Sequence, residues 1–334
     1  MSMEKIAVIG GGAWGTALAS LAAESGRPVE LYAREKGVID SINDSNENSL
    51  FLKDMKLNPT VTARYMDDLS SCDAQYIIWT VPTQFSRSVA RQYSALLKGR
   101  YILNASKGIE IDTGKLVVQT LAEEIDAKFA ILSGPSFAKE VALKKLTAVS
   151  LSSNDPEVAK WWQRELSCDY FRVYTASDMV GLEVGGAVKN VIAIATGLSD
   201  GIGMDDNARA GIITRGLAEI ARLGISYGAQ RETFYGLAGL GDLVLTTTGD
   251  KSRNRQVGKL LAEGLTVEDI QKKYNSVAEG VFTAKAVYLE AQRHNISMPI
   301  CTEVYRIIYE GKNPIESAND LMRRPLRPEE DETI

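Results

Sequence analysis

The sequence predicts an α/β protein with a Rossmann-like, doubly wound parallel sheet in its N-terminal part and an all-helical C-terminal part. At residues 6–19 an apolar run leads into a glycine-rich turn and then a helix. Strand-like and helical patterns alternate as far as about residue 182, and strand-like runs nearly vanish beyond it. Since single cores commonly stop growing near ~250–300 residues, we expect two domains, residues 1–182 and 183–334.

The first strand–turn–helix unit carries a nucleotide-binding pattern. Residues 6–9 are apolar and rich in β-branched side chains, as in a buried parallel strand. In the Gly-x-Gly-x-x-Gly turn, Gly10 permits a tight turn, Gly12 lets a pyrophosphate approach the backbone, and Gly15 lets the helix pack on the strand. The pattern predicts dinucleotide binding; the alternative is an ordinary strand–turn–helix.

The residue after the second strand indicates the cofactor. We expect that strand at residues 29–33, and Arg34 follows it, before Glu35. An arginine at this position accommodates the 2′-phosphate of NADP, whereas an acid favours NAD. The order therefore favours NADP(H), with NAD(H) possible, over a solvated loop charge at Arg34.

The remaining elements follow from hydrophobic periodicity. Residues 35–60 are polar and Asn-rich, and we expect a helix and an irregular connection there. Further strands are expected at 76–81, 101–106, 129–132, 147–152 and 171–174, with helices at 83–97, 115–124 and 156–166. In the second domain we expect helices at about 183–198, 207–225, 230–237, 252–263, 267–273, 281–294 and 300–310.

Composition excludes several classes of function. With 38 basic and 43 acidic residues the net charge is −5, which gives no reason to expect nucleic acid or an anionic membrane as a partner. We expect no secretory signal and no membrane insertion, because no apolar stretch is long enough to span a bilayer. Cys72, Cys168 and Cys301 are widely spaced, so we expect no metal site and a cytoplasmic location.

Two polar segments should join the glycine turn at one edge of the sheet. Residues 106–108 and 133–136 each follow a predicted strand. Ligands of open α/β sheets bind outside the carboxyl ends of the strands. These segments are therefore candidates for contact with the cofactor or substrate.

Lys189 is the first candidate catalytic residue. On a helix, residues 182, 185, 186, 189, 193 and 196 share one face, and that face carries little bulk around a single lysine. Gly185 and Gly186 inside a helix cost roughly 1 kcal/mol each, so a close backbone approach is expected there. The alternative is tight helix packing with Lys189 extending to solvent.

A dehydrogenase needs a group that exchanges a proton with the substrate oxygen. The single histidine, His294, lies near the polar end of a predicted helix, where a surface or capping role is expected. A lysine can serve if burial and neighbours lower its pKa, and Lys107 beside Lys189 would do so. Asp242, in a glycine-rich segment, is the candidate carboxylate that orients them; the alternative is a helix-linking turn.

A third segment predicts a phosphate site. Ser252 is a good N-cap for the helix that follows, and Arg253 and Asn254 stand in its first turn. The helix dipole, the backbone N–H groups and a forked guanidinium would then act on one anion. The alternative is a basic solvated turn.

With these residues in view, the chain resembles NAD(P)-dependent glycerol-3-phosphate dehydrogenase of the soluble bacterial type. The resemblance extends from residue 5 to about residue 325. The matching stretches, in family order, are GGGAWGTALA (10–19), ASKGIE (105–110), SGPSFAKE (133–140), GGAVKNVIAI (185–194), GLGDL (239–243), SRNR (252–255) and VAEG (277–280).

The resemblance implies reversible reduction of dihydroxyacetone phosphate to sn-glycerol 3-phosphate, a precursor of glycerophospholipids. It implies that Lys189 exchanges the proton, that Lys107 contacts the carbonyl oxygen, and that Asp242 orients Lys189. The implied substrate residues are Lys107, Gly134, Ser136, Lys189, Asn190, Asp242, Ser252, Arg253 and Asn254. The implied cofactor residues are Gly10, Gly12, Ala13, Trp14, Gly15, Arg34, Lys107, Ala138, Arg253, Val277 and Glu279.

Two other functions fit parts of the pattern. One is a dehydrogenase of the same architecture that acts on a different hydroxy acid or sugar, against which the 252–255 segment argues. The other is a dinucleotide-binding redox sensor, which would not require Lys189 and Asp242 to lie together. A homodimer is expected by analogy with the fold.

Overall fold

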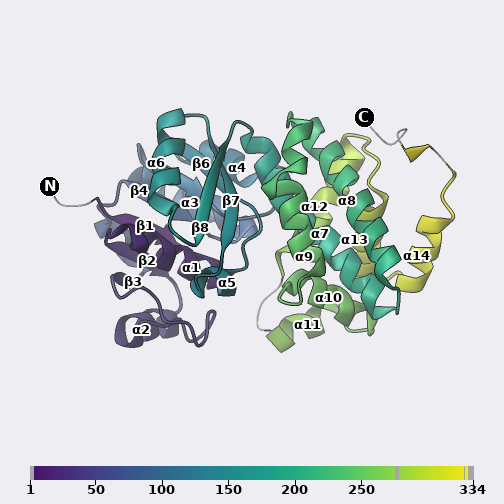
Figure 1. The fold of residues 1–334 in the computed structure, drawn as a ribbon, viewed down its shortest axis with the longest axis horizontal. Helices are drawn as coiled ribbons and strands as arrows, with labels where there is room; N and C mark the ends of the chain where they lie inside the picture. Colours follow the sequence, from purple (N-terminus) through teal and green to yellow (C-terminus); the bar gives the residue numbers. More distant parts are fainter. Residues whose placement is uncertain (1–3, 275–277, 327, 330–334) are drawn as a thin grey trace. The chain divides into compact units, whose positions relative to one another are not determined.

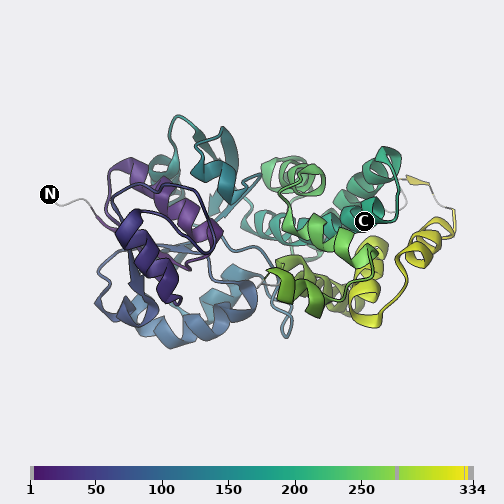
Figure 2. The ribbon, with the colours of Figure 1, turned by 90° about the horizontal axis from the view of Figure 1, so that it is seen from below.

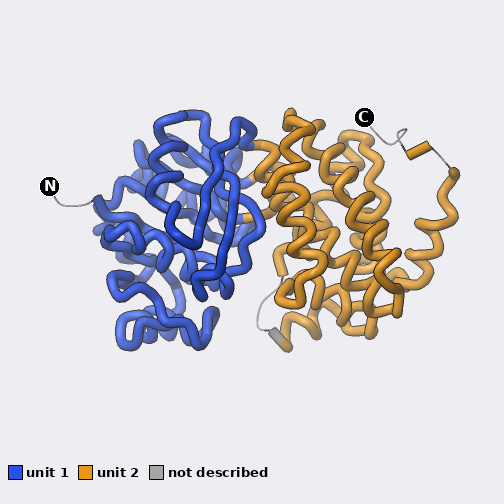
Figure 3. The backbone as a smooth tube through the Cα atoms, in the orientation of Figure 1, with its two compact units in different colours: residues 1–106, 117–179 blue, residues 107–116, 180–334 orange. Residues whose placement is uncertain are grey.

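The computed structural model describes residues 4–274, 278–326, 328 and 329, and it divides into two compact units (Figures 1 and 3). Unit 1 comprises residues 1–106 and 117–179, and unit 2 comprises residues 107–116 and 180–334. The chain therefore divides at residue 179, at the start of a long helix, and not at the expected residue 182. The short segment 107–116, expected in the first domain, belongs to unit 2.

Unit 1 contains an eight-stranded sheet in the order β3-β2-β1-β4-β5-β6-β7-β8. All neighbouring strands run parallel except the pair β6 and β7. The mostly parallel, Rossmann-like sheet confirms the predicted fold class. The strands are β1 (Ile6–Ile9), β2 (Val29–Ala33), β3 (Val61–Tyr65), β4 (Tyr76–Trp79), β5 (Tyr101–Asn104), β6 (Lys128–Ser133), β7 (Thr147–Ser153) and β8 (Phe171–Ala176).

Helices cover both faces of this sheet, which explains why β1 is apolar at every position. Ile6 and Val8 point into one core, and Ala7 and Ile9 into another. The core that contains Ile6 and Val8 also contains side chains of α1, α2 and α6, and the core that contains Ala7 and Ile9 also contains side chains of α3 and α4. Figure 2 shows α1 and α3 on opposite sides of the unit. These helices, with the short α5, are α1 (Ala13–Ala22), α2 (Lys36–Ser45), α3 (Thr83–Leu97), α4 (Val117–Glu124), α5 (Ala138–Ala142) and α6 (Pro156–Leu166).

The sheet differs from the prediction in two respects. Strand β3 was not expected, because only Val61 and Ala63 of its five residues are buried and it lies at the edge of the sheet. Strand β7 runs antiparallel to β6, whereas the prediction was a wholly parallel sheet. The connection 134–146 holds only the five-residue α5, which is too short to carry the chain back along the sheet as the helix of a parallel crossover does.

Unit 2 is built from helices in the part of the chain that the structure describes. Two non-α turns, η3 (Arg231–Tyr235) and the π-helical η4 (Leu237–Gly241), replace the predicted helix at 230–237. The α-helices are α7 (Met179–Gly201), α8 (Asp206–Ser226), α9 (Asp242–Thr248), α10 (Arg253–Ala262), α11 (Val267–Tyr274), α12 (Glu279–Arg293), α13 (Pro299–Glu310) and α14 (Pro314–Met322). Helices α9 and α14 were not predicted.

The core of unit 2 forms around α7. Val184, Val188, Val191 and Ile192 are fully buried in one apolar cluster with residues of α8, α12 and α13. The sequence analysis expected no apolar stretch long enough to span a bilayer, but among the described residues α7 alone has that length and composition. The window that qualifies is 94% buried inside the protein. A helix that is apolar on all sides is typical of a protein core, and α7 fits that role.

The segment 107–116 belongs to unit 2 because it is fixed there by burial and hydrogen bonding. Ile109 and Leu116 form a β-bridge and are fully buried in the α7 core. The Tyr227 hydroxyl donates to the carbonyl oxygen of Gly114 at 2.6 Å. Lys107, at the start of the segment, is consequently positioned by unit 2.

Candidate active site

The glycine turn after β1 has the geometry that nucleotide binding requires. Gly10 has φ +122°, and a Cβ there would lie 2.6 Å from the Thr80 hydroxyl. A Cβ on Gly15 would lie 2.0 Å from the Gly10 carbonyl oxygen. The fold itself therefore requires these two glycines. Gly12, the N-cap of α1, has no atom within 4 Å of its Cβ position, so its open side fits the approach of a pyrophosphate to the helix N-terminus.

Asn48 supports this turn and was missed by sequence reasoning. Its buried amide nitrogen donates to the Gly11 carbonyl at 2.9 Å and to the Thr16 hydroxyl at 2.8 Å. Its amide oxygen accepts the backbone N–H groups of residues 50 and 51, which fixes the orientation of the amide. The sequence offered no sign of this role beyond the position of Asn48 in an Asn-rich segment that was expected to be an irregular connection.

The other predicted cofactor residues of unit 1 lie around the same turn. Ala13 begins α1, and the indole of Trp14 donates to the Ala105 carbonyl at 3.1 Å. Arg34 follows β2 directly, and its side chain is 75% exposed, with Glu35 at 3.5 Å. An exposed guanidinium at the end of β2 can meet a 2′-phosphate.

The segment after β6 also lies at the carboxyl end of its strand. Gly134 has φ +145°, and a Cβ there would lie 2.9 Å from the Cα of Val149. The Ser136 hydroxyl donates to the Gly134 carbonyl at 3.0 Å, and Ala138 begins α5. The turn therefore requires Gly134 and gives Ser136 a fixed place.

In unit 2, one carboxylate holds two lysines. Asp242 Oδ1 lies 3.0 Å from Lys189 Nζ, and Asp242 Oδ2 accepts a hydrogen bond from Lys107 Nζ at 2.6 Å. Lys189 and Asp242 are buried, and Lys107 is largely buried. The structure thus brings together the three residues expected to be catalytic, and all three belong to unit 2.

Thr246 is a fourth member of this group that the sequence analysis did not identify. Its hydroxyl accepts a hydrogen bond from Lys189 Nζ at 2.7 Å and donates to the Asp242 carbonyl at 2.7 Å. Asp242 and Thr246 are four residues apart, so they share one face of α9. That spacing was the available signal.

Burial lowers the pKa of Lys189 to about 8 because it disfavours the charged ammonium. The Asp242 carboxylate opposes this effect, and the charge of Lys107 adds to it. A lysine with a pKa near neutrality can both give and take a proton under physiological conditions. The group therefore provides a general acid–base beside a second ammonium that can stabilise negative charge on an oxygen.

The glycines around this group serve close backbone packing. A Cβ on Gly185 would lie 2.6 Å from the Ala238 carbonyl oxygen, so α7 can approach η4 only without a side chain there. A Cβ on Gly239 would lie 2.2 Å from the Phe234 carbonyl oxygen. The expected backbone approach at Gly185 is therefore present, and it brings Lys189 of α7 to Asp242 of α9.

A chain of amides connects α7, α10 and α12. The Asn254 amide nitrogen donates to Asn190 Oδ1 at 2.9 Å, and Asn254 Oδ1 accepts the Gly280 N–H at 3.1 Å. Ser252 is the N-cap of α10, and its hydroxyl accepts the Arg255 N–H at 3.2 Å. Arg253, in the first turn, is exposed. These residues form a polar helix N-terminus with an exposed arginine in its first turn, a combination that is suited to a phosphate.

Two remaining predictions concern α12. Glu279 is the first residue of α12, whereas Val277 lies outside the described residues. His294 follows α12, and its half-exposed ring has Nε2 3.3 Å from Glu290 Oε2. Within the described residues, no cluster of three or more His, Cys, Asp and Glu side chains could hold a metal ion.

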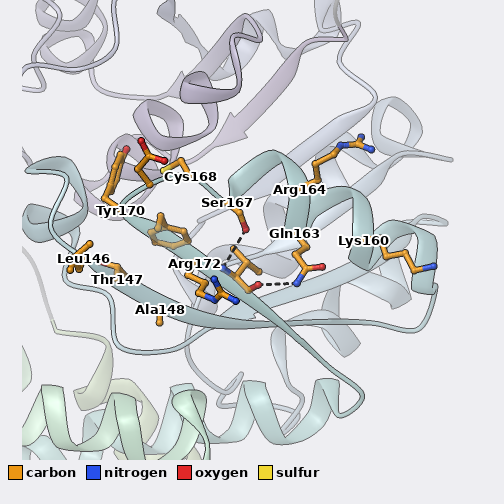
Figure 4. A pocket seen from close by; sticks show the side chains of 13 residues that line it. Leu146, Thr147, Ala148, Lys160, Gln163, Arg164, Ser167, Cys168, Tyr170 and Arg172 are labelled. Carbon is orange, nitrogen blue, oxygen red and sulfur yellow. Dashed lines mark hydrogen bonds between the residues drawn. The ribbon is translucent and has the colours of Figure 1, made fainter.

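A cavity of about 660 Å³ in unit 1 lies elsewhere, along α6 and the edge strand β8 (Figure 4). The Gln163 amide donates to the Val173 carbonyl at 2.9 Å, and the Ser167 hydroxyl accepts the Val173 N–H at 3.4 Å. These side chains satisfy backbone groups of an edge strand. None of the predicted site residues lines this cavity.

Known proteins resemble this chain over nearly its whole length. Family models described as the N-terminus and C-terminus of NAD-dependent glycerol-3-phosphate dehydrogenase match residues 5–159 and 178–319. A glycerol-3-phosphate dehydrogenase [NAD(P)+] of Geobacter sulfurreducens is 46% identical over 331 residues, which cover 98% of this chain and 99% of that protein. The crystal structure of glycerol-3-phosphate dehydrogenase from Coxiella burnetii superposes with a TM-score of 0.92 at 38% identity, covering 96% of this chain and 99% of that one.

Proposed function

The chain belongs to the NAD-dependent glycerol-3-phosphate dehydrogenase family, and on that premise we propose that Lys189 exchanges the proton in its reaction. The family reduces dihydroxyacetone phosphate to glycerol 3-phosphate with NAD(P)H. The observation that supports Lys189 is its contact with Asp242 at 3.0 Å in a buried setting that lowers its pKa to about 8.

The proposed roles follow from charge. NAD(P)H held at the glycine turn of residues 10–15 would supply a hydride, and the former carbonyl oxygen would then carry negative charge. Lys189 gives that oxygen its proton, and the Lys107 ammonium stabilises the charge before transfer is complete. Asp242, which contacts both ammonium groups, orients them, and Thr246 fixes the Lys189 amine from another side. In the oxidative direction Lys189 accepts the proton.

We further propose that the phosphate of the substrate binds at the start of α10. Ser252, Arg253 and Asn254 would hold it, with Asn190 beside them through its hydrogen bond to Asn254. Anchoring the phosphate fixes the position of the distant carbonyl, so binding energy contributes to rate. Gly134 and Ser136 are also proposed to contact the substrate.

Replacing Arg253 tests the phosphate site. The Arg253→Ala variant should raise KM for dihydroxyacetone phosphate strongly, by about a hundredfold, since charge-assisted bonds of this kind contribute about 1.5–3 kcal/mol. It should hardly alter turnover of unphosphorylated dihydroxyacetone. Lys272→Ala removes an exposed cation from the neighbouring helix α11 and serves as the control. Equal losses on both substrates would reject the assignment.

For the cofactor we propose the glycine turn (Gly10, Gly12, Gly15) as the pyrophosphate site. Arg34 at the ribose 2′ position supports a preference for NADP(H), with NAD(H) also accepted. Further contacts are proposed for Ala13, Trp14, Lys107, Ala138, Arg253, Val277 and Glu279.

The setting of the enzyme is likewise a proposal. We propose that it works in the cytoplasm as a homodimer and supplies glycerol 3-phosphate for glycerophospholipid synthesis. The cysteines Cys72, Cys168 and Cys301 are free thiols, which fits a reducing compartment. Light scattering on the purified chain would measure the oligomeric state directly, and a monomeric mass would reject the dimer.

A further inference from the structure

Arg255 joins the start of α10 to the end of α7 by a buried ion pair. Its Nε donates to Asp200 Oδ2 at 2.8 Å, and one terminal nitrogen lies 2.7 Å from the same oxygen. The other terminal nitrogen donates to Asp250 Oδ1 at 2.8 Å and to the Thr248 carbonyl at 3.4 Å. One guanidinium thus ties together α7, the loop before α10, and α10 itself.

Asp200 is itself held in place. Its side chain is 8% exposed, and Oδ1 accepts hydrogen bonds from Arg209 of α8 at 2.7 and 3.2 Å. Both oxygens of the carboxylate are therefore occupied by arginines from two different helices. Asp200 acts as a fixed point at the end of α7 from which Arg255 can set the position of α10.

The two helices also meet at backbone distance. A Cβ on Gly197 would lie 2.0 Å from the Arg255 carbonyl oxygen, and a Cβ on Gly258 would lie 2.1 Å from the Ile194 carbonyl oxygen. A contact this close cannot slide without a clash. The ion pair and the glycine contact together fix the first turn of α10 against α7.

We propose that Arg255 and Asp200 are positioning residues that hold the phosphate-binding turn 252–254 at a set distance from Lys189. This inference rests on the proposed phosphate site. Lys189 and Asp200 lie on the same helix, eleven residues or about 16 Å apart along its axis. Because α7 carries Lys189 and anchors α10 through Asp200, it determines the span between phosphate and proton donor.

The proposal is tested by Arg255→Lys, which keeps the charge but loses the planar fork that reaches Asp200 and Asp250 together. We expect kcat/KM for dihydroxyacetone phosphate to fall about tenfold, since small displacements of a bound group can cost up to about a hundredfold. The value for unphosphorylated dihydroxyacetone should stay within twofold. Asp250→Asn, at a side chain that is 95% exposed, should act in the same direction without a risk to folding.

Arg222→Lys is the matched control, because Arg222 is buried in unit 2 and donates to the Ser297 carbonyl away from α10. It should leave the ratio of the two kcat/KM values unchanged. The positioning role is rejected if Arg255→Lys and Asp250→Asn lower kcat/KM equally for the two substrates, or leave both values unchanged. Measuring Arg253→Ala alongside separates the failures. If only Arg253→Ala shows a phosphate-specific loss, the role of Arg255 and Asp200 is overturned and the phosphate site stands. If Arg253→Ala shows no such loss, the phosphate site is overturned and this inference with it.

Discussion

Replacing Asp242 by asparagine should move the pH dependence of the reaction in a direction that the structure fixes. The substitution keeps the shape of the side chain and removes the charge that faces Lys189 and Lys107. Asp242 raises the pKa of Lys189, whereas burial and Lys107 lower it. Without the carboxylate, only the two lowering influences remain, so the pKa of Lys189 must fall below about 8.

The size of the shift follows from Coulomb's law. The ammonium nitrogen lies 3.0 Å from the nearer oxygen, so the charge centres are roughly 4 Å apart. At an effective dielectric constant of about 20 that pair is worth about 4 kcal/mol, or roughly 3 pKa units. Water that enters the site will solvate the ammonium and reduce the shift, so we expect the pKa of Lys189 to fall by about 2 to 3 units.

The assay is kcat/KM for the reduction of dihydroxyacetone phosphate at a series of pH values. The reduction needs Lys189 protonated, so kcat/KM of the native enzyme should be constant below about pH 8 and fall tenfold per pH unit above it. In the Asp242→Asn enzyme, kcat/KM should already fall tenfold per unit from about pH 5 to 6, as the downward shift of about 2 to 3 units requires. Substrate phosphate, with a second pKa near ~6, titrates over the same range with both enzymes, so the native profile is the control for its contribution. A break that stays near pH 8 in the variant would refute the electrostatic role of Asp242.

Two further predictions concern the nucleotide. Asn48→Ala should raise KM for NADPH about tenfold, because the glycine turn loses two hydrogen bonds from a buried amide. The control Asn43→Ala should leave this KM unchanged, because the Asn43 amide bonds to Ala63 instead. Steady-state kinetics with NADPH as the varied substrate measures both values. Arg34→Asp should lower kcat/KM for NADPH at least tenfold relative to NADH, and an unchanged ratio of the two initial rates would remove Arg34 from the 2′-phosphate site.

Local sequence patterns predicted the positions where the residue type itself carries the signal. Gly10 and Gly15 occupy a turn whose geometry requires glycine, and Ser252 caps the helix that was expected to follow it. The small residues around Lys189 predicted a close backbone contact, and Gly185 makes it. In each case the residue type alone carries the signal, although Thr80 and Ala238, which require glycine at residues 10 and 185, are distant in the sequence.

What depends on tertiary contacts could not be predicted. Asn48 stands 37 residues from Gly11, and nothing in its own segment indicates that its amide supports that turn. The segment 107–116 reads as part of the first domain, yet burial of Ile109 and Leu116 places it in unit 2. The role of Asn48 and the placement of residues 107–116 both depend on burial against residues distant in the sequence. Such burial leaves no periodic pattern in a short segment.

Replacing Lys189 by methionine shows whether this side chain carries the proton. Methionine keeps the apolar stem of the side chain and removes the amine that contacts Asp242 and Thr246. We predict that Lys189→Met binds NADPH with unchanged Kd while kcat for dihydroxyacetone phosphate falls by about a thousandfold or more. Turnover within tenfold of the native enzyme, with the same nucleotide affinity, would contradict the assignment of Lys189 as the proton carrier.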